Sequence, residues 1–234
     1  MTHYPGLELD LFAQALNWKK YLTQHMAPEI QGSVLEVGAG TGNTTLHLCN
    51  QSISSWTCLE PDPNLLAHLT ARIHQGIIPP SCKTLCGTLT DLPPEIRFDR
   101  ILYVDVLEHI QDDQAELQRA CSHLTNHQGR LIILSPAHEY LYTPFDAAIG
   151  HVRRYDRHTL RALIPPGMVV EKLRYLDSVG LLASLANRLF FRQSMPTIDQ
   201  IHVWDRLMVP LSRWFDPLLR YRLGKSILLV ARVT

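Results

Sequence analysis

The chain has 234 residues, of which 46% are hydrophobic and 19% charged, and this globular composition excludes a largely disordered protein. Lysine plus arginine and aspartate plus glutamate both number 22, so no overall charge favours nucleic acid or an acidic membrane. Five cysteines without a C-x-x-C pair argue against a disulfide framework and predict a reducing, cytoplasmic location. No secretory signal and no uninterrupted apolar run of about 18 residues is visible, so we expect no transmembrane segment.

Short apolar runs alternate with helix-like segments over the first 137 residues. A polar helical lead covers about residues 8–27. Strands are expected at 33–38, 55–60, 82–87, 98–106 and 129–136, with helices at 41–51, 62–74 and 111–124. Asp62 followed by Pro63 predicts where the second of these helices begins. Buried strands separated by helices predict a doubly wound α/β sheet with parallel strands.

The last third of the chain has a different pattern. Two strands are expected at 168–176 and 226–233, separated by a helical region from about Val179 to Leu223. We interpret its apolar stripe as an ordinary packed helix pair rather than a membrane surface. The stripe consists of Leu181, Leu182, Leu185, Leu189, Phe190, Trp204, Leu207, Met208, Leu211, Trp214, Phe215, Leu218 and Leu219. The sequence therefore predicts one domain over 1–234 with a helical insertion at 179–223.

A glycine-rich loop, "VLEVGAGTG", joins the first strand to the first helix of this sheet. Gly38 and Gly40 permit a tight turn and close approach of a ligand to the backbone, and Gly42 lies where the helix begins. Asn43 occupies the position where a dinucleotide fingerprint needs its third glycine, and no Gly-Lys-Ser/Thr follows. The pattern indicates a nucleotide-type loop, although glycines of this kind can also serve only a strand-to-helix turn.

Two acidic residues limit which ligand this loop can bind. Glu36 lies inside the first strand, where a buried carboxylate needs a cationic or hydrogen-bonding partner. Glu60 ends the second strand, where an acid can bind both ribose hydroxyls. A carboxylate suited to an amino or sulfonium group, a close glycine turn and a ribose acid together favour S-adenosylmethionine over NAD.

Four segments carry a resemblance to a known family: "VLEVGAGTGNTT", "LEPDP", "FDRILYVDVLEHI" and "GRLIILSPA". In order and spacing, over about residues 33–137, they resemble motifs I, post-I, II and III of class I S-adenosylmethionine-dependent methyltransferases. The resemblance implies a Rossmann-like seven-stranded sheet whose last strand is antiparallel, and S-adenosyl-L-methionine as cofactor. It implies that the cofactor is bound by Glu36, Gly38, Ala39, Gly40, Gly42, Glu60, Pro61, Thr88, Leu89 and Asp105. Thr88 stands where the family commonly has an aspartate.

The lead segment "NWKKY", with Trp18 and Tyr21, resembles the N-terminal helix that closes over the cofactor in many of these enzymes. An aromatic anchor that holds this helix to the core is an equal alternative. We accordingly expect an N-terminal helical lid at 1–30, with Tyr21 near the cofactor, and a cofactor-binding core at 31–137.

Methyl transfer to a hydroxyl needs a base, and histidine suits that role near neutral pH. His109 follows the fourth strand, and His138 and His151 follow the fifth, at the edge of the sheet where ligands bind. Tyr142 and Arg154 complete the expected catalytic set.

The segment 138–165 is expected to form an acceptor lid. Its D-x-x-x-G-H-x-R-R-Y pattern resembles a subgroup found with glycosyltransferases and with polysaccharide or natural-product pathways. The pattern is met by Asp146, Gly150, His151, Arg153, Arg154 and Tyr155. Its arginines can pair with a carboxylate or phosphate on the acceptor, or internally with Asp146 or Asp156.

A metal is a minor alternative at the end of the fourth strand. Asp105, Glu108 and His109 resemble the Glu-x-x-Glu-His cluster of some methyltransferases that act on small-RNA termini or quinone precursors. The tripeptide "LEH" within this cluster is also frequent in metal-free members, where it shapes the floor of the cofactor site, and we expect no metal.

The sequence thus predicts methyl transfer to an oxygen or nitrogen of a small-molecule, natural-product or carrier-linked glycan or lipid acceptor. Methylation of RNA or protein and a non-catalytic cofactor-binding partner are the alternatives. The balanced charge and the absence of an added RNA module argue against nucleic acid, and a homodimer is an assembly that the sequence allows.

Overall fold

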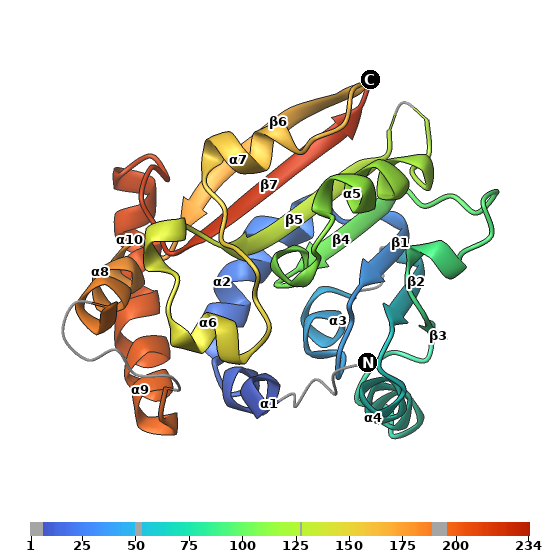
Figure 1. Ribbon diagram of the computed structural model, residues 1–234. Coiled ribbons are helices and arrows are strands. Elements are labelled where there is room, and N and C mark those ends of the chain that lie inside the picture. The colour runs from blue at the N-terminus through green and yellow to red at the C-terminus, as the bar shows by residue number, and fades with distance from the viewer. Residues whose placement is uncertain (1–6, 50–52, 127, 189–195) are drawn as a thin grey trace.

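The computed structural model describes residues 7–49, 53–126, 128–188 and 196–234, and it contains a seven-stranded sheet (Figure 1). The strands lie in the order β3-β2-β1-β4-β5-β7-β6. They are β1 (Gly32–Val37), β2 (Ile53–Glu60), β3 (Cys82–Cys86), β4 (Arg100–Val104), β5 (Arg130–Pro136), β6 (Met168–Leu176) and β7 (Ser226–Val233). β7 is antiparallel to its neighbours β5 and β6, whereas the pairs formed by β1 to β5 are parallel. The predicted sheet, including its antiparallel last strand, is confirmed.

The helices fall mainly between the strands, as the alternating pattern predicts. They are α1 (Leu7–Ala13), α2 (Leu16–Met26), α3 (Asn43–Leu48), α4 (Pro63–His74), α5 (Asp113–Ser122), α6 (Pro144–Ala148), α7 (Arg157–Ala162), α8 (Ser178–Ala186), α9 (Ile198–Val203) and α10 (Val209–Leu218). Short helical turns include η1 (Ala27–Glu29), η2 (Leu89–Asp91), η3 (Leu107–His109), η4 (Glu139–Leu141) and the π-helical η6 (Trp204–Met208). Asp62 caps α4 by accepting hydrogen bonds from Asn64 N and Leu65 N, as expected.

Successive side chains of each strand point to opposite faces of the sheet and so build two apolar layers. In β1, Val34 packs in the layer that contains α2, α3 and α4, whereas Leu35 packs in the layer that contains α5 and α7. Helices therefore cover both faces of the sheet, and the loops that follow the parallel strands meet at one edge.

The polar lead forms two helices rather than one. Asp205 accepts hydrogen bonds from Asn17 N (3.1 Å) and Trp18 N (2.8 Å), the free backbone donors at the beginning of α2. A residue from the helical region between β6 and β7 thus caps an N-terminal helix. The lead and this region are consequently joined at their buried surfaces.

The helical region 179–223 contains α8, α9, η6 and α10 among its described residues. Trp204 and Val209 are buried as expected of packed helices, but Trp214 and Leu218 are among its most exposed side chains. The expected packed stripe is therefore only partly formed, and Leu189 and Phe190 of that stripe lie outside the described residues. Within the described ranges, no helix is both long enough and apolar enough to cross a bilayer.

Candidate active site

A cavity of about 790 Å³ opens at the edge of the sheet where the loops meet. The glycine loop, the segments after β4 and β5, and the helices α2, α8 and α9 all contribute to its wall. The wall includes Leu22, Met26, Gly38, Ala39, Gly40, Asp105, Glu108, His109, Asp146, His151, Arg154, Val203, Trp204 and Lys225. The volume is within the usual range for small-molecule sites, roughly 300–1,000 Å³.

The three glycines of the first loop serve different purposes. All three have left-handed φ angles, between 55° and 78°. A Cβ on Gly38 would lie 2.6 Å from a methyl group of Val106, and one on Gly42 equally close to Ile78, so both are needed for packing. A Cβ on Gly40 would meet only Leu9, at 3.7 Å. Gly40 therefore presents open backbone to the cavity, which is the feature a closely bound cofactor requires.

Glu60 fixes the conformation of this loop. Its Oε2 accepts a hydrogen bond from Gly40 N (2.8 Å) and its Oε1 accepts one from Asp62 N (2.9 Å). Burial raises the pKa of Glu60, while these two hydrogen bonds lower it. Each carboxylate oxygen retains a lone pair for a further donor such as a ribose hydroxyl.

Three of the residues that the resemblance implies for cofactor binding lie outside the wall of the cavity. Pro61, Thr88 and Leu89 do not line it. Thr88 caps η2 in a capping box with Asp91, and Leu89 is buried in the layer containing α5.

Glu36 is placed differently from the expectation. Its Oε2 accepts hydrogen bonds from Thr45 Oγ1 and from Trp56 Nε1 (2.9 Å), and the carboxyl group does not line the cavity. Burial raises its pKa to about 7 despite these two donors. The hydrogen-bonding partner that a buried acid requires is therefore inside the protein.

Asp105 faces the cavity from the end of β4. It adopts a left-handed φ of 54°, and its backbone N donates to Leu134 O (2.9 Å), so the turn carries the side chain away from the strand. The side chain is accessible, yet it lies inside the cavity wall, and desolvation there raises its pKa to about 6. His151 and Lys225 oppose this increase by favouring the carboxylate.

His151, Asp146 and Arg154 form a buried, hydrogen-bonded group on the lid. The Asp146 Oδ1 atom lies 2.9 Å from His151 Nδ1, and the same carboxylate accepts hydrogen bonds from Arg154 Nε and Nη2, each 2.9 Å long. Thr143 also donates to Asp146 in a capping box at the beginning of α6. The Nε and Nη2 atoms of Arg154 are thus both bound to Asp146. The imidazole of His151 is held through Nδ1, so its Nε2 points away from Asp146.

The second arginine of the lid motif is also paired internally. Arg153 forms an ion pair with Asp113 and donates to Gln111 O (2.7 Å). Asp156 caps α7 instead of binding an arginine, because it accepts hydrogen bonds from His158 N and Thr159 N. Of the two expected uses of these arginines, the structure shows internal pairing.

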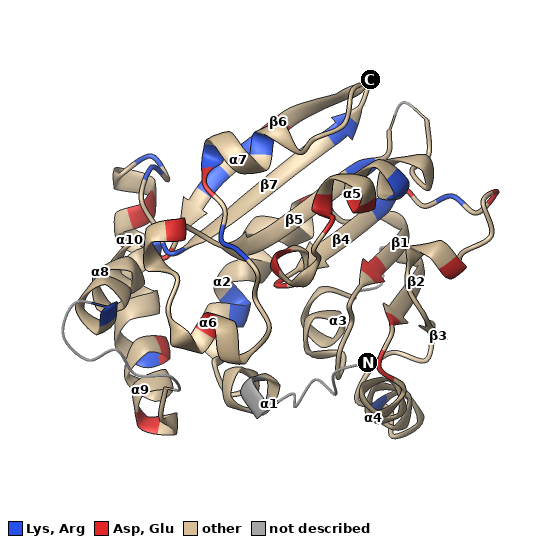
Figure 2. Ribbon diagram, in the orientation of Figure 1, with Lys and Arg blue, Asp and Glu red and all other residues tan. Residues whose placement is uncertain are grey.

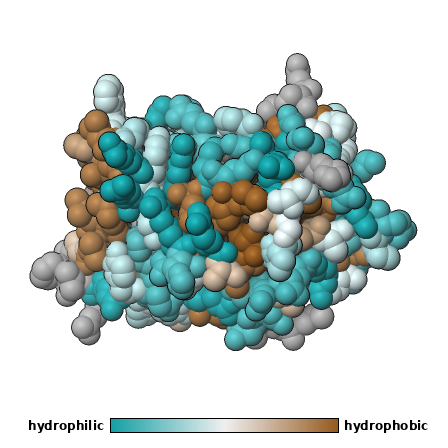
Figure 3. All heavy atoms as spheres, turned by 90° about the horizontal axis from the view of Figure 1, so that it is seen from above, coloured by the Kyte–Doolittle hydropathy of each residue, from teal (hydrophilic) through white to brown (hydrophobic). Residues whose placement is uncertain are grey.

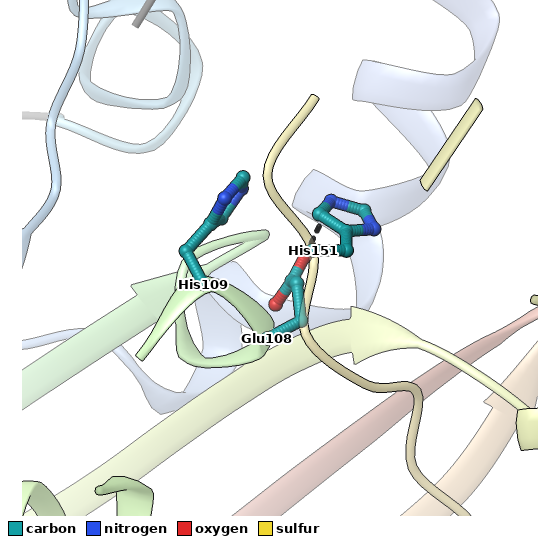
Figure 4. Close-up of side chains that lie close together, drawn as sticks. All are labelled: Glu108, His109 and His151. Atoms are coloured by element: carbon teal, nitrogen blue, oxygen red, sulfur yellow. Dashed lines mark ion pairs between the residues drawn. The ribbon is translucent and has the colours of Figure 1, made fainter. Parts of the chain in front are cut away.

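Glu108 and His109 of η3 lie opposite His151 (Figure 4). One ligand atom from each of the three residues lies within 4.8 Å of the others. Glu108 Oε1 is 3.7 Å from His151 Nε2 and has no hydrogen-bond partner, whereas Glu108 Oε2 accepts from Ser135 Oγ (2.8 Å). Burial lowers the pKa of His109 to about 4 and raises that of Glu108 well above its usual range. Two imidazoles and an unpaired carboxylate oxygen fit a divalent transition metal.

Three further predicted site residues lie away from this cavity, and Gly42 and Glu60 do not line it either, although Glu60 supports the glycine loop. His138 Nε2 lies 3.0 Å from Gly224 O, and its ring stacks on Tyr140. Tyr142 donates its hydroxyl to the backbone oxygen of His151 (2.6 Å), and Tyr21 donates to Asp216 Oδ2 (2.7 Å). None of the three lines the wall of the cavity.

The prediction also missed cavity residues from distant segments. The wall also contains Trp18 and Lys19 of α2, Trp204 of η6, and Lys225, which is the residue before β7. The Lys225 ammonium lies 3.6 Å from the centre of the Trp204 ring and 3.5 Å from Asp177 Oδ2. The expected lid segment "NWKKY" contained Trp18 and Lys19, and "LGKSILLV" contained Lys225, but neither pattern indicates which side chain points inward.

Comparisons with known proteins agree with this geometry. Residues 34–129 match a family model described as a methyltransferase domain. The S-adenosylmethionine-dependent methyltransferase from Clostridium acetobutylicum is 11% identical, with a TM-score of 0.60, and the match covers 98% of this chain and 96% of that one. No curated protein sequence matches the chain significantly.

Two further solved structures show how widely the fold is used. Coclaurine N-methyltransferase bound to N-methylheliamine and SAH is 14% identical, with a TM-score of 0.59, over 91% of this chain and 70% of that one. The [4+2]-cyclase SpnF is 16% identical, with a TM-score of 0.63, over 97% of this chain and 94% of that one. At such low identity these structures establish the shared fold and leave the acceptor open.

Proposed function

We propose that the chain is a class I S-adenosylmethionine-dependent methyltransferase that methylates an oxygen or nitrogen of a small-molecule or carrier-linked glycan or lipid acceptor, and the methyltransferase-domain match over residues 34–129 supports this. One observation carries this proposal. His151, held by Asp146, lies in the wall of the same cavity as the open backbone of Gly40. A candidate base and a candidate cofactor loop therefore share one enclosed space.

Gly40, Glu60 and Asp105 are the residues that would hold the cofactor. When bound, S-adenosylmethionine supplies a methyl group on a cationic sulfonium centre. Gly40 allows close contact, Glu60 offers acceptors for the ribose hydroxyls, and Asp105 offers a carboxylate to the cationic methionine end. Glu36 and Tyr21 contribute indirectly, by holding the first helix and the lead in place.

His151 is proposed to remove the proton of the acceptor. Its Nδ1 is held by Asp146, so Nε2 is the nitrogen that can accept a proton. The Asp146 carboxylate stabilises the imidazolium that results, and Arg154 positions that carboxylate through its two hydrogen bonds. Arg154 is therefore a positioning residue in this proposal.

The walls of the cavity favour an acceptor with an apolar part. Leu22, Met26 and Trp204 contribute apolar surface to the wall, which also contains polar side chains such as Lys19, Asp105 and His151. A cavity with this apolar surface suits a small or carrier-linked acceptor better than an RNA strand, which needs a cationic groove and stacking surfaces.

A second candidate mechanism rests on the unpaired oxygen of Glu108. A divalent cation bound by Glu108, His109 and His151 would give that buried atom a partner, with Asp146 orienting His151 from behind. The cation would occupy His151 Nε2, so proton removal by His151 and metal binding by His151 exclude each other. Chelation separates the two mechanisms.

The test uses methyl-labelled cofactor and a panel of phenols, amines and lipid-linked sugars. We expect His151→Ala to lower turnover by about 10²–10⁴, the usual contribution of a general base. The affinity for S-adenosylhomocysteine should change little, and His158→Ala on the exposed side of α7 is the matched control. Unchanged turnover in His151→Ala would exclude this residue as the base. Loss of activity in EDTA that Mn²⁺ restores would favour the metal mechanism.

A further inference from the structure

The helices between β6 and β7 carry a continuous apolar face that is turned away from the protein. Its members recur every three or four positions through η6 and α10, as on one side of a helix. They are Leu207, Leu211, Trp214, Phe215 and Leu218, with Leu182 of α8 and Val203 of α9 beside them. Trp214 is 78% and Leu218 75% exposed. Figure 3 shows apolar atoms gathered along the side of the molecule where Figure 1 places α8 and α10.

The charges around this face are almost all positive. Arg188, Arg206, Arg220 and Arg222 are exposed, and Arg213 is half-exposed. Among the described residues of this helical region, Asp199 is the one exposed acidic side chain. Figure 2 marks the acidic and basic residues of these helices on the ribbon, without regard to burial.

The two remaining aspartates of these helices are buried and do not offset the arginines. Asp205 caps α2, and Asp216 accepts hydrogen bonds from Tyr21 Oη (2.7 Å) and Ser178 N (2.9 Å). The exposed surface is therefore both apolar and cationic, although the net charge of the whole chain is zero.

The same helices connect this face to the cavity. α8, α9 and η6 line the cavity with their inner sides, through Ala183, Ile201 and Trp204 among others. Val203 is 48% exposed and also lines the cavity, so the apolar face continues to its wall. A surface bound to this face would lie beside the part of the cavity wall that contains Val203.

We propose that this face docks on an anionic phospholipid bilayer, with α10 lying in the plane of the headgroups. An aromatic and aliphatic stripe bordered by arginines is the pattern of an interfacial helix, in which apolar burial and attraction to anionic lipid act together. A second copy of the chain is a poorer occupant, because a twofold contact would place the same arginines opposite one another. The proposal concerns binding alone and holds whichever acceptor is methylated.

Trp214 provides a direct measurement of docking. The chain has four tryptophans, and Trp18, Trp56 and Trp204 are buried. We expect vesicles of phosphatidylcholine mixed with phosphatidylglycerol to sediment the protein and to shift the Trp214 emission to shorter wavelength. Vesicles of phosphatidylcholine alone should bind at least about tenfold more weakly, and added salt should weaken binding to the anionic vesicles.

Two variants and one control define the surface. Trp214→Ala with Leu218→Ala should lower affinity for the anionic vesicles by more than about tenfold, because both side chains lose apolar burial. Arg206→Gln with Arg220→Gln should remove most of the salt dependence. Ile77→Ala with Ile96→Ala removes exposed apolar side chains elsewhere and should change nothing. Unchanged binding of S-adenosylhomocysteine shows that each variant is folded.

Two results would overturn the proposal. One is equal binding to anionic and neutral vesicles, or binding to neither. The other is a dimer of the unmodified chain in light scattering that the Trp214 and Leu218 substitutions convert to a monomer, which would assign the face to a second copy. Neither result bears on methyl transfer, since no acceptor is present in these measurements.

Discussion

The two sides of the cavity are built on different physical principles. On the cofactor side, the loop is shaped by left-handed glycines and by one carboxylate, Glu60, which contacts backbone groups 2 and 20 residues away in the sequence. On the lid side, Asp146, His151 and Arg154 are charged or titratable side chains that bind one another in a buried cluster. The first side depends on backbone geometry and the second on paired charge, so substitutions should affect them differently.

Removal of the Asp146 charge, on the lid side, should have the largest effect on stability and turnover. Asp146→Asn leaves the buried side of Arg154 without its counter-ion, and we expect a loss of about 3 kcal/mol in the free energy of unfolding. Turnover should fall with it, because His151 loses its orientation. Urea denaturation at pH 7 measures the first effect. Glu95→Gln, on an exposed residue far from the lid in the sequence, is the control.

The pH dependence of this effect follows from the pKa of Asp146. Burial opposes ionisation, but hydrogen bonds from His151 and Arg154 outweigh it and hold the pKa well below its usual range. A depressed carboxyl pKa contributes stability that is complete above its unfolded value, about 3.9, and is lost as the pH falls below it. The difference between the unmodified chain and Asp146→Asn should therefore narrow below about pH 4. If the stability difference between the two proteins stayed constant below pH 4, Asp146 could not be the ionised group proposed here.

On the cofactor side, Glu60→Ala should mainly affect ligand affinity. The variant loses two hydrogen bonds from its loop together with the acceptors for ribose, so we expect S-adenosylhomocysteine to bind about 10²-fold more weakly. Isothermal titration measures this. Glu60→Gln keeps one acceptor oxygen, so its affinity for S-adenosylhomocysteine should lie between those of the alanine variant and the unmodified chain. If the alanine variant bound as tightly as the unmodified chain, the cofactor could not be bound at this loop.

Alanine substitution of Gly40 should have the smallest effect, and comparison with Gly76 separates backbone strain from contact with the cofactor. Gly40 and Gly76 both have left-handed φ angles, 55° and 71°, and neither would have a close Cβ contact. Alanine at either position should cost about 1–2 kcal/mol of stability, because left-handed backbone is unfavourable for residues with a Cβ. Only Gly40→Ala should also weaken the binding of S-adenosylhomocysteine, by about tenfold. Equal affinity in the two variants would show that Gly40 does not face the cofactor.

The parts of the structure that are local in sequence were predictable. The strands and the α4 cap were recognisable because period, turn residues and capping residues act over a few positions. The left-handed backbone at His138 turns its ring toward Tyr140, and no pattern in the sequence indicates such a turn.

Long-range contacts account for the other differences. Glu36 finds Thr45 and Trp56, and Lys225 meets Trp204, only after the chain has folded. The apolar period of α10 was visible in the sequence, but a period shows only that a helix has an apolar side. It does not show whether the protein itself covers that side.

The contact between α2 and Asp205 has a consequence for synthesis on the ribosome. The helix α2, which lines the cavity, is capped by a residue that lies 187 positions after Trp18. During translation, the strands β1 to β5 can therefore emerge and pair before this helix has its final support. The nascent chain would hold an incomplete pocket until Asp205 has left the exit tunnel, so termination before this residue would yield a sheet without the supported helix α2.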